Sequence, residues 1–359
     1  SAGQAAADVG SDRRRGDTLT ASNAPQAVAV VGAGSWGTAL ALQFARSGCD
    51  VRLGGIVELD ELATMATRRE NVRYLPGIKF PANLSACETI EECLELARDI
   101  LVAVPSHGLR ETLRQIKPLL GPDSRVCWAT KGFELHTGKL PHQVAAEILG
   151  AERPMAVLSG PTFAKEVSMG LPTAMTIAAN DSDFSEALAV GISDGAFRAY
   201  TSDDLVGVEV GGAVKNVLAI GAGMSDGLGF GANTRVALIT RGLVEMTRLG
   251  VALGASKETF MGLAGMGDLV LTCTDNLSRN RRMGLALAKG MTVEEAQEEI
   301  QQVVEGVMAA EAVREVSREL DIEMPICEQV YQILYEGASP REAVEKLMAR
   351  RLKSEKEHV

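Results

Sequence analysis

Three polar stretches interrupt the largely apolar second half of this 359-residue chain, and two of them hold one charged residue that could do chemistry. Lys215 lies in the run GGAVKNVLAI, where burial of an uncompensated ammonium would cost several kcal/mol. It therefore either extends to water or occupies a site with a partner. In such a site desolvation would lower its pKa toward neutrality, which suits a general acid or base. Asp268, in GLAGMGDLVLTC, is either a helix-capping aspartate or a functional carboxylate.

The third stretch, SRNRR at residues 278–282, is the densest basic cluster of the part that is expected to fold. Ser278 is a good N-cap, and Arg279 and Asn280 add side-chain donors to the free N–H groups of a first helical turn. Together they predict a cradle for a phosphate or carboxylate. The alternative is an ordinary solvated helix start. Because the chain has a net charge of −11, an anionic substrate would need a local basic pocket of this kind.

A glycine-rich segment near the N-terminus predicts a second anion site. The apolar residues 28–31 lead into GAGSWG, and a helical stretch then runs to Gly48. Gly32 would allow the tight turn, Gly34 would let the backbone approach a pyrophosphate, and Gly37 would let helix and strand pack closely. The first N–H groups of the helix would face the anion. Strand, turn and helix together indicate that a dinucleotide, NAD or NADP, binds here.

Composition narrows the class of protein. The acidic balance argues against nucleic acid or an anionic membrane surface as a partner. The six cysteines form no CxxC pair or zinc spacing, and with only four histidines we expect no metal site and a reducing cytoplasm. No apolar run approaches the length of a membrane span, so we expect no membrane insertion. Residues 1–24 lack the apolar core of a signal peptide and are expected to form a disordered tail.

The hydrophobic patterns predict an α/β fold: a doubly wound, mostly parallel Rossmann sheet in residues 25–202, then an all-α domain in residues 203–350 and a polar tail in residues 351–359. Lys131 directly follows the predicted strand 125–130, at the carboxyl edge where ligands bind such sheets. A turn and a helix start likewise follow the strand 154–159. The predicted helices of the second domain are 204–225, 232–250, 278–289, 293–300, 306–320, 325–337 and 339–350.

Five motifs, in this order and spacing, resemble those of the bacterial NAD(P)-dependent glycerol-3-phosphate dehydrogenases. They are GAGSWGTALA, ATKG, SGPTFAKE, GGAVKNVLAIGAGMSDGLGFGAN and GDLVLTCTDNLSRNRR. The likeness covers about residues 27–350 and agrees with the fold predicted above. It implies reversible hydride transfer between NAD(P)H and dihydroxyacetone phosphate, giving sn-glycerol 3-phosphate for phospholipid synthesis. It also implies a homodimer, because the family is commonly dimeric.

The resemblance also implies residue roles. Lys215 would protonate the carbonyl oxygen as hydride reaches the carbon, and Asp268 would orient that lysine or bind substrate hydroxyls. The implied substrate-binding residues are Lys131, Gly160, Thr162, Lys215, Asp268, Ser278, Arg279 and Asn280. The implied cofactor-binding residues are Gly32, Gly34, Ser35, Trp36, Gly37, Ile56, Lys131, Ala164, Arg279, Val303 and Glu305.

One segment departs from the family pattern. After the second strand the family usually has Trp, a small residue and then a basic residue or histidine, whereas this chain has Gly54, Gly55 and Ile56. The missing base removes a partner for the 2′-phosphate, so we expect weaker discrimination in favour of NADP, and the preference between NAD and NADP stays open. Two alternatives also stay open: a related β-hydroxyacid dehydrogenase, and a sensor that binds NAD without catalysis.

Overall fold

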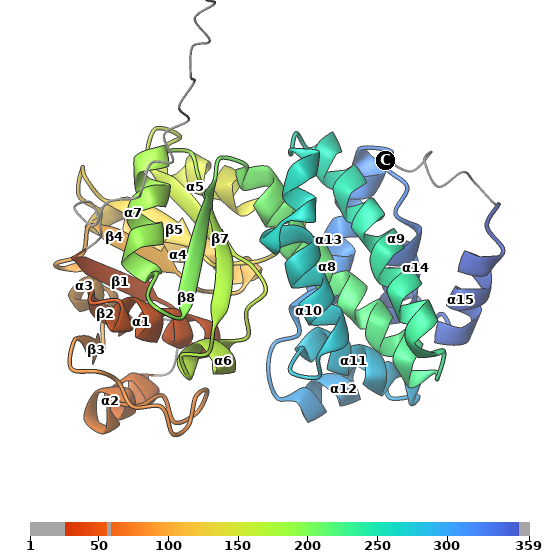
Figure 1. Ribbon diagram of the computed structural model, residues 1–359, viewed down its shortest axis with the longest axis horizontal. Coiled ribbons are helices and arrows are strands. Elements are labelled where there is room, and N and C mark those ends of the chain that lie inside the picture. The colour runs from red at the N-terminus through yellow and green to blue at the C-terminus, as the bar shows by residue number, and fades with distance from the viewer. Residues whose placement is uncertain (1–25, 56–58, 352–359) are drawn as a thin grey trace, which may run out of the picture.

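A computed structural model describes residues 26–55 and 59–351, and Figure 1 shows a sheet-containing half beside a helical half. The sheet has eight strands in the order β3-β2-β1-β4-β5-β6-β7-β8. Neighbouring strands are parallel except β6 and β7, which are antiparallel. The strands are β1 (Ala27–Val31), β2 (Asp50–Gly54), β3 (Leu84–Ala86), β4 (Asp99–Val102), β5 (Arg125–Trp128), β6 (Met155–Ser159), β7 (Thr173–Ala179) and β8 (Phe197–Ser202).

Helices cover both faces of this sheet, as its sequence pattern requires. In β1, Val28 and Val30 join one apolar cluster, while Ala29 and Val31 join the other, because successive side chains of a strand point to opposite faces. Strands β4, β5 and β6 are buried throughout, as expected for parallel strands between two helical layers. The helices of this half are α1 (Ser35–Arg46), α2 (Leu59–Arg68), α3 (Ile90–Leu94), α4 (Ser106–Ile116) with the 3-10 turn η2 (Lys117–Leu119), α5 (Pro141–Leu149), α6 (Ala164–Ser168) and α7 (Ser182–Ile192).

The helical half is built around one long core helix, α8 (Leu205–Gly227), which is buried from Gly207 to Ser225. By length and composition α8 could cross a membrane, but 89% of its apolar window is buried inside the protein. Its small residues let neighbours approach closely, since a Cβ at Gly223 would lie 2.1 Å from the carbonyl oxygen of Arg281 on α11. The other elements are α9 (Gly231–Ala252), the 3-10 turn η3 (Lys257–Met261), the π turn η4 (Leu263–Gly267), α10 (Asp268–Thr274), α11 (Arg279–Ala288), α12 (Val293–Ile300), α13 (Glu305–Glu319), α14 (Pro325–Tyr335) and α15 (Pro340–Met348).

The predicted fold class is confirmed: a mostly parallel sheet precedes an all-helical part. The seven predicted helices of the second half occur with ends within two residues of those expected. The sequence pattern missed strand β3, helix α5 and the short helical turns between 257 and 274. The three residues of β3 are too few to show a period, and the glycines of η4 oppose a regular helix. The predicted tails lie outside the described residues, except for residue 351.

Candidate active site

A cleft of about 370 Å³ opens between the two halves, and its walls come from the carboxyl edge of the sheet, from α8 and from the start of α11. Ten of the residues singled out from the sequence line it. They are Ser35, Trp36, Lys131, Thr162, Ala164, Lys215, Ser278, Arg279, Asn280 and Glu305. The structure therefore brings together residues that are far apart in the chain and that the sequence could only nominate one by one.

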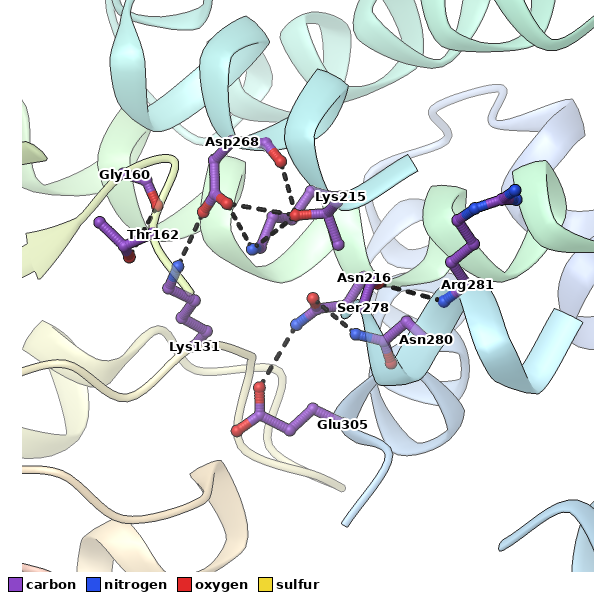
Figure 2. Close-up of polar contacts among 11 residues, drawn as sticks. Lys131, Gly160, Thr162, Lys215, Asn216, Asp268, Ser278, Asn280, Arg281 and Glu305 are labelled. Carbon is purple, nitrogen blue, oxygen red and sulfur yellow. Dashed lines mark hydrogen bonds and ion pairs between the residues drawn. The ribbon is translucent and has the colours of Figure 1, made fainter. Parts of the chain in front are cut away.

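Asp268 lies behind the cleft and holds two lysines at once (Figure 2). Its Oδ2 accepts a hydrogen bond from Lys131 Nζ at 2.7 Å, and its Oδ1 accepts one from Lys215 Nζ at 2.6 Å. The Lys215 ammonium also donates to Thr272 Oγ1 at 3.0 Å. Asp268 is 0% exposed and Lys215 is buried, so this trio of two cations and one anion is nearly withdrawn from water. Lys215 thus occupies a site with partners and does not extend to water. Asp268 is not the cap of α10, because the N-cap of that helix is Gly267.

The electrostatics of the trio bring Lys215 close to neutrality. Its pKa falls from 10.5 to about 8, because desolvation by burial and the charge of Lys131 outweigh the opposing carboxylates of Asp268 and Glu305. Burial alone would raise the pKa of Asp268, but the charges and hydrogen bonds of the two lysines hold it below its ordinary value. At neutral pH the carboxylate is thus ionised, and Lys215 is an ammonium that can give up its proton.

The start of α11 presents Arg279 to the cleft while its neighbours are held by the protein. Ser278 caps the helix by accepting a hydrogen bond from the backbone N–H of Arg281 at 3.2 Å, as the sequence predicted. Asn280 donates to Asn216 Oδ1 at 2.9 Å and accepts from the Gly306 N–H at 2.8 Å. Within the described part of the chain, Arg279 makes no hydrogen bond or ion pair, so its guanidinium is available to an anion.

The glycine turn has the form that a bound pyrophosphate needs. Gly32 has φ +118, a conformation that L side chains rarely adopt, and a Cβ at Gly37 would lie 1.9 Å from the Gly32 carbonyl oxygen. A Cβ at Gly34 would meet no heavy atom of the described residues within 4 Å, so the turn faces open space. No side chain caps α1, and its first turn holds no acid. Trp36 Nε1 is a buried donor without a partner among the described residues. These features fit a dinucleotide cofactor.

Several nominated residues do not line the cleft. The three glycines of the turn lie beneath it, and Asp268 lies behind the lysines. Gly160 packs against β7, where a Cβ would lie 2.8 Å from the Met175 Cα atom, so its lack of a side chain already has a packing reason. Val303 is 45% exposed in the segment before α13 and is absent from the cleft wall. Ile56 lies outside the described residues.

Sequence reasoning missed other residues of the cleft. Tyr74 and Phe163 bring aromatic surface to its wall, and Asn216 and Thr272 bring polar groups. Thr272 could have been found, because it follows Asp268 by four residues and so shares its helical face. Tyr74 gave no signal, because its segment reads as an ordinary loop with a Pro-Gly turn.

A second and larger cavity, of about 720 Å³, lies among α8, α9, α14 and α15. Its lining is mostly apolar, and it contains none of the residues nominated from the sequence. Among the described residues, no group of three or more His, Cys, Asp or Glu could hold a metal ion. The chemistry of this protein therefore centres on the smaller cleft, where the charged groups converge.

A doubly wound sheet with a glycine turn, joined to a helical half that supplies a buried lysine, defines a two-domain dehydrogenase that uses a nicotinamide cofactor. The comparisons give the family. Residues 27–185 match the family model of the NAD-dependent glycerol-3-phosphate dehydrogenase N-terminus, and residues 204–345 match that of its C-terminus. The chain belongs to the NAD-dependent glycerol-3-phosphate dehydrogenase family.

Individual relatives agree with this placement. The glycerol-3-phosphate dehydrogenase [NAD(P)+] of Klebsiella pneumoniae is 55% identical over 331 residues, covering 92% of this chain and 97% of that protein. Its counterpart in Photobacterium profundum is 54% identical over 327 residues, covering 91% and 96%. The crystal structure of glycerol-3-phosphate dehydrogenase from Coxiella burnetii is 48% identical and superposes with a TM-score of 0.87, covering 90% of this chain and 99% of that one.

Proposed function

We propose that this protein catalyses the reversible NAD(P)H-dependent reduction of dihydroxyacetone phosphate to sn-glycerol 3-phosphate, and so supplies phospholipid synthesis. One observation carries the proposal. A buried lysine with a pKa of about 8 faces the same cleft as an arginine at a helix start that has no hydrogen-bond or ion-pair partner among the described residues. This substrate has a carbonyl group that must be protonated and a phosphate that must be bound. Lys215 can protonate the carbonyl group, and Arg279 can bind the phosphate.

Lys215 is the general acid and base of the proposed reaction. Its ammonium is held from one side by Asp268 Oδ1 and Thr272 Oγ1, which leaves its third N–H free to point at a substrate oxygen. As negative charge develops on the carbonyl oxygen, Lys215 donates a proton to it, and in the reverse direction the neutral amine removes that proton. Asp268, which Lys131 holds by its other oxygen, keeps the ammonium in place, and both lysines add positive potential beside the developing charge.

Arg279 is the phosphate anchor of the proposed site. Its guanidinium can form two parallel hydrogen bonds to a phosphate, and the first turn of α11 adds the positive end of a helix dipole. Ser278 and Asn280 support this anchor by fixing the helix start, through the cap on Arg281 and the link to Gly306. Thr162 lies on the opposite wall, where its hydroxyl can meet the substrate.

The cofactor would be held by the glycine turn, the start of α1 and the wall residues Ser35, Trp36 and Ala164. Bound there, the reduced nicotinamide supplies the hydride. Gly32, Gly34, Gly37, Val303 and Glu305 complete the proposed cofactor set. The segment from Gly54 to Ile56 offers no base to a 2′-phosphate, so we propose that NADP is not strongly preferred.

The proposal is tested by following absorbance at 340 nm with dihydroxyacetone phosphate, in parallel with NADH and with NADPH. Oxidation of either cofactor supports the proposed function, and no oxidation of either would overturn it in favour of a hydroxyacid substrate or a sensor. A Lys215→Ala variant separates an enzyme from a sensor. An enzyme loses turnover while it keeps cofactor binding, whereas a sensor keeps its function.

We further propose a cytoplasmic homodimer with a dinucleotide-binding domain at 25–202 and a substrate-binding domain at 203–350. Strand β8 ends at Ser202 and α8 begins at Leu205, which supports the boundary. All six cysteines are buried and none of them forms a disulfide, which suits a reducing compartment. Light scattering after size-exclusion chromatography tests the dimer: a mass of one chain, 38.0 kDa, would contradict it.

A further inference from the structure

A second buried acid on α8, Glu209, lies outside the trio and has no role in the mechanism above. Its side chain is fully buried, and its carboxylate receives three hydrogen bonds. Glu209 Oε1 accepts from Trp128 Nε1 at 2.9 Å and from the backbone N–H of His142 at 3.0 Å, while Oε2 lies 2.6 Å from His142 Nδ1. One carboxylate thus joins the last residue of β5, the first turn of α5 and the core helix α8.

Two of the three elements that Glu209 joins, β5 and α8, position the lysines of the trio. Lys131 follows Trp128 by three residues, and Lys215 follows Glu209 by six residues, which is about 9 Å along a helix. Gly212 lies between Glu209 and Lys215 on α8, and a Cβ at this glycine would come 3.3 Å from Lys131 Cγ. The aliphatic stem of Lys131 therefore passes directly over α8, so a small slide of that helix against β5 would displace one lysine relative to the other.

We propose that Glu209 is a positioning residue for the reaction: by holding α8 in register with β5 and α5, it lets Lys131 and Lys215 reach the two oxygens of Asp268 together. This inference rests on the proposed role of Lys215. Under this proposal Glu209 does more than accept hydrogen bonds at the first turn of α5. The backbone hydrogen bonds of the sheet already fix β5 but do not fix α8, so a polar link between β5 and α8 can set their register.

Displacement of Lys131 would change the pKa of Lys215. Its charge lowers the pKa of Lys215, so retreat of Lys131 would raise that pKa, and water entering the trio would act in the same direction. The other charged groups that influence Lys215 are the carboxylates of Asp268 and Glu305, which already raise its pKa, and Cys273 is a neutral thiol nearby. A shifted register therefore moves the alkaline limb of ketone reduction, which reports protonated Lys215, to higher pH.

The titration of His142 must be distinguished from that of Lys215 in the pH profile. Burial alone would lower its pKa, but the hydrogen bond and the charge of Glu209 raise it above its ordinary value. Trp128→Phe removes a donor to Glu209 and leaves both Glu209 and His142 in place, so it distinguishes an effect on Lys215 from a change in the charge of His142. The test follows the alkaline limb of the pH profile, which is assigned to Lys215.

The chain offers a matched control. Glu245 of α9 is also a buried carboxylate that caps a helix, because it accepts from the backbone N–H groups of Ile326 at 2.7 Å and Cys327 at 3.1 Å. Among the described residues it forms no hydrogen bond or ion pair with the trio, and it lines the other cavity. Glu245→Met thus perturbs a comparable cap, by the same substitution, without touching β5. Loss of stability alone should affect both sites alike, whereas a change of register should follow only Glu209.

The experiment measures kcat and KM from pH 6 to 10 for four variants. In Glu209→Met we expect kcat to fall roughly 10- to 100-fold, as for displacement of a catalytic group by about 1 Å. We also expect an alkaline limb at least half a pH unit higher, with the KM for NADH unchanged within about twofold. Trp128→Phe removes one donor and should act in the same direction, and it carries the test should Glu209→Met fail to fold. Glu209→Gln keeps an oxygen acceptor and should restore most of kcat. Glu245→Met should keep the wild-type limb.

Two results would overturn the role of Glu209: folded Glu209→Met or Trp128→Phe protein with the wild-type limb, or the same shift in Glu245→Met. Failure of the proposed function would look different. The wild-type protein would then show no activity, or would keep its alkaline limb after Lys215 is replaced by Arg.

Discussion

Replacement of Lys215 should abolish activity and yet stabilise the protein. On folding, burial lowers the pKa of this lysine from 10.5 to about 8, so its charged form is less favourable in the folded state. At about 1.4 kcal/mol for each tenfold change in proton affinity, the difference is about 3 kcal/mol of lost stability at pH 7. Lys215→Met removes that penalty. Asp268 is not stranded, because its Oδ2 keeps its hydrogen bond to Lys131 at 2.7 Å.

The pH dependence of stability is a second test of whether Lys215 destabilises the protein. Below pH 8 Lys215 is charged in both states, so the penalty is fully present. Between pH 8 and about 10.5 only the unfolded state binds the proton, so the penalty shrinks as the pH rises, to about 1 kcal/mol at pH 9.5. Lys215→Met should therefore unfold at a higher urea concentration than the wild-type protein at pH 7, and the advantage should be smaller at pH 9.5.

Asp268→Asn is the contrasting perturbation. It leaves two buried ammonium groups without their shared carboxylate, and loss of one partner from a buried ion pair costs about 3 to 5 kcal/mol. Both variants should lose turnover, but urea unfolding monitored by circular dichroism should move in opposite directions. Unfolding of Lys215→Met at a lower urea concentration than the wild-type protein at pH 7 would refute the reasoning, because it would mean that the lysine is net stabilising.

Three further predictions concern the ligands. Arg279→Ala should raise the KM for dihydroxyacetone phosphate by roughly 10- to 100-fold, since a charge-assisted hydrogen bond contributes about 1.5 to 3 kcal/mol; an unchanged KM would rule out the phosphate anchor. Gly37→Ala should abolish NADH binding in a fluorescence titration, because its Cβ would lie 1.9 Å from the Gly32 carbonyl oxygen, and normal affinity would contradict the packing argument. KM values for NADH and NADPH should be similar, and a much lower KM for NADPH would count against the effect assigned to Gly54–Ile56.

Local patterns predicted most of the fold because its elements are long and its strands are buried on both faces. The strand before GAGSWG and the helix after it, for example, require no knowledge of distant contacts. Strand β3 escaped notice because three residues cannot display a period. Helix α10 did so because it emerges from a glycine-bearing π turn that depends on the packing of η3 and α8.

The candidate site was predicted as separate parts and not as an arrangement. Lys215 drew attention as a charge in an apolar run, and Lys131 as a cation after a strand. Their common partner could not be read from the chain, because Asp268 lies 137 residues from one lysine and 53 from the other. Glu209 carries the same signal as Lys215, a charge in the apolar run of the same helix, but its partners Trp128 and His142 lie too far away in the chain to be read from the sequence.

The arrangement also explains how a protein of net charge −11 can accept an anionic substrate. At physiological ionic strength charges more than about 8 Å apart are largely screened, so the acidic surface contributes little inside the cleft. What the substrate meets is the local wall, where one carboxylate faces several cations. These cations are Lys131, Lys165, Lys215, Arg279 and Arg282, and the carboxylate is that of Glu305. Asp268 lies behind the wall, where it steadies two of the cations and cannot repel the phosphate at close range.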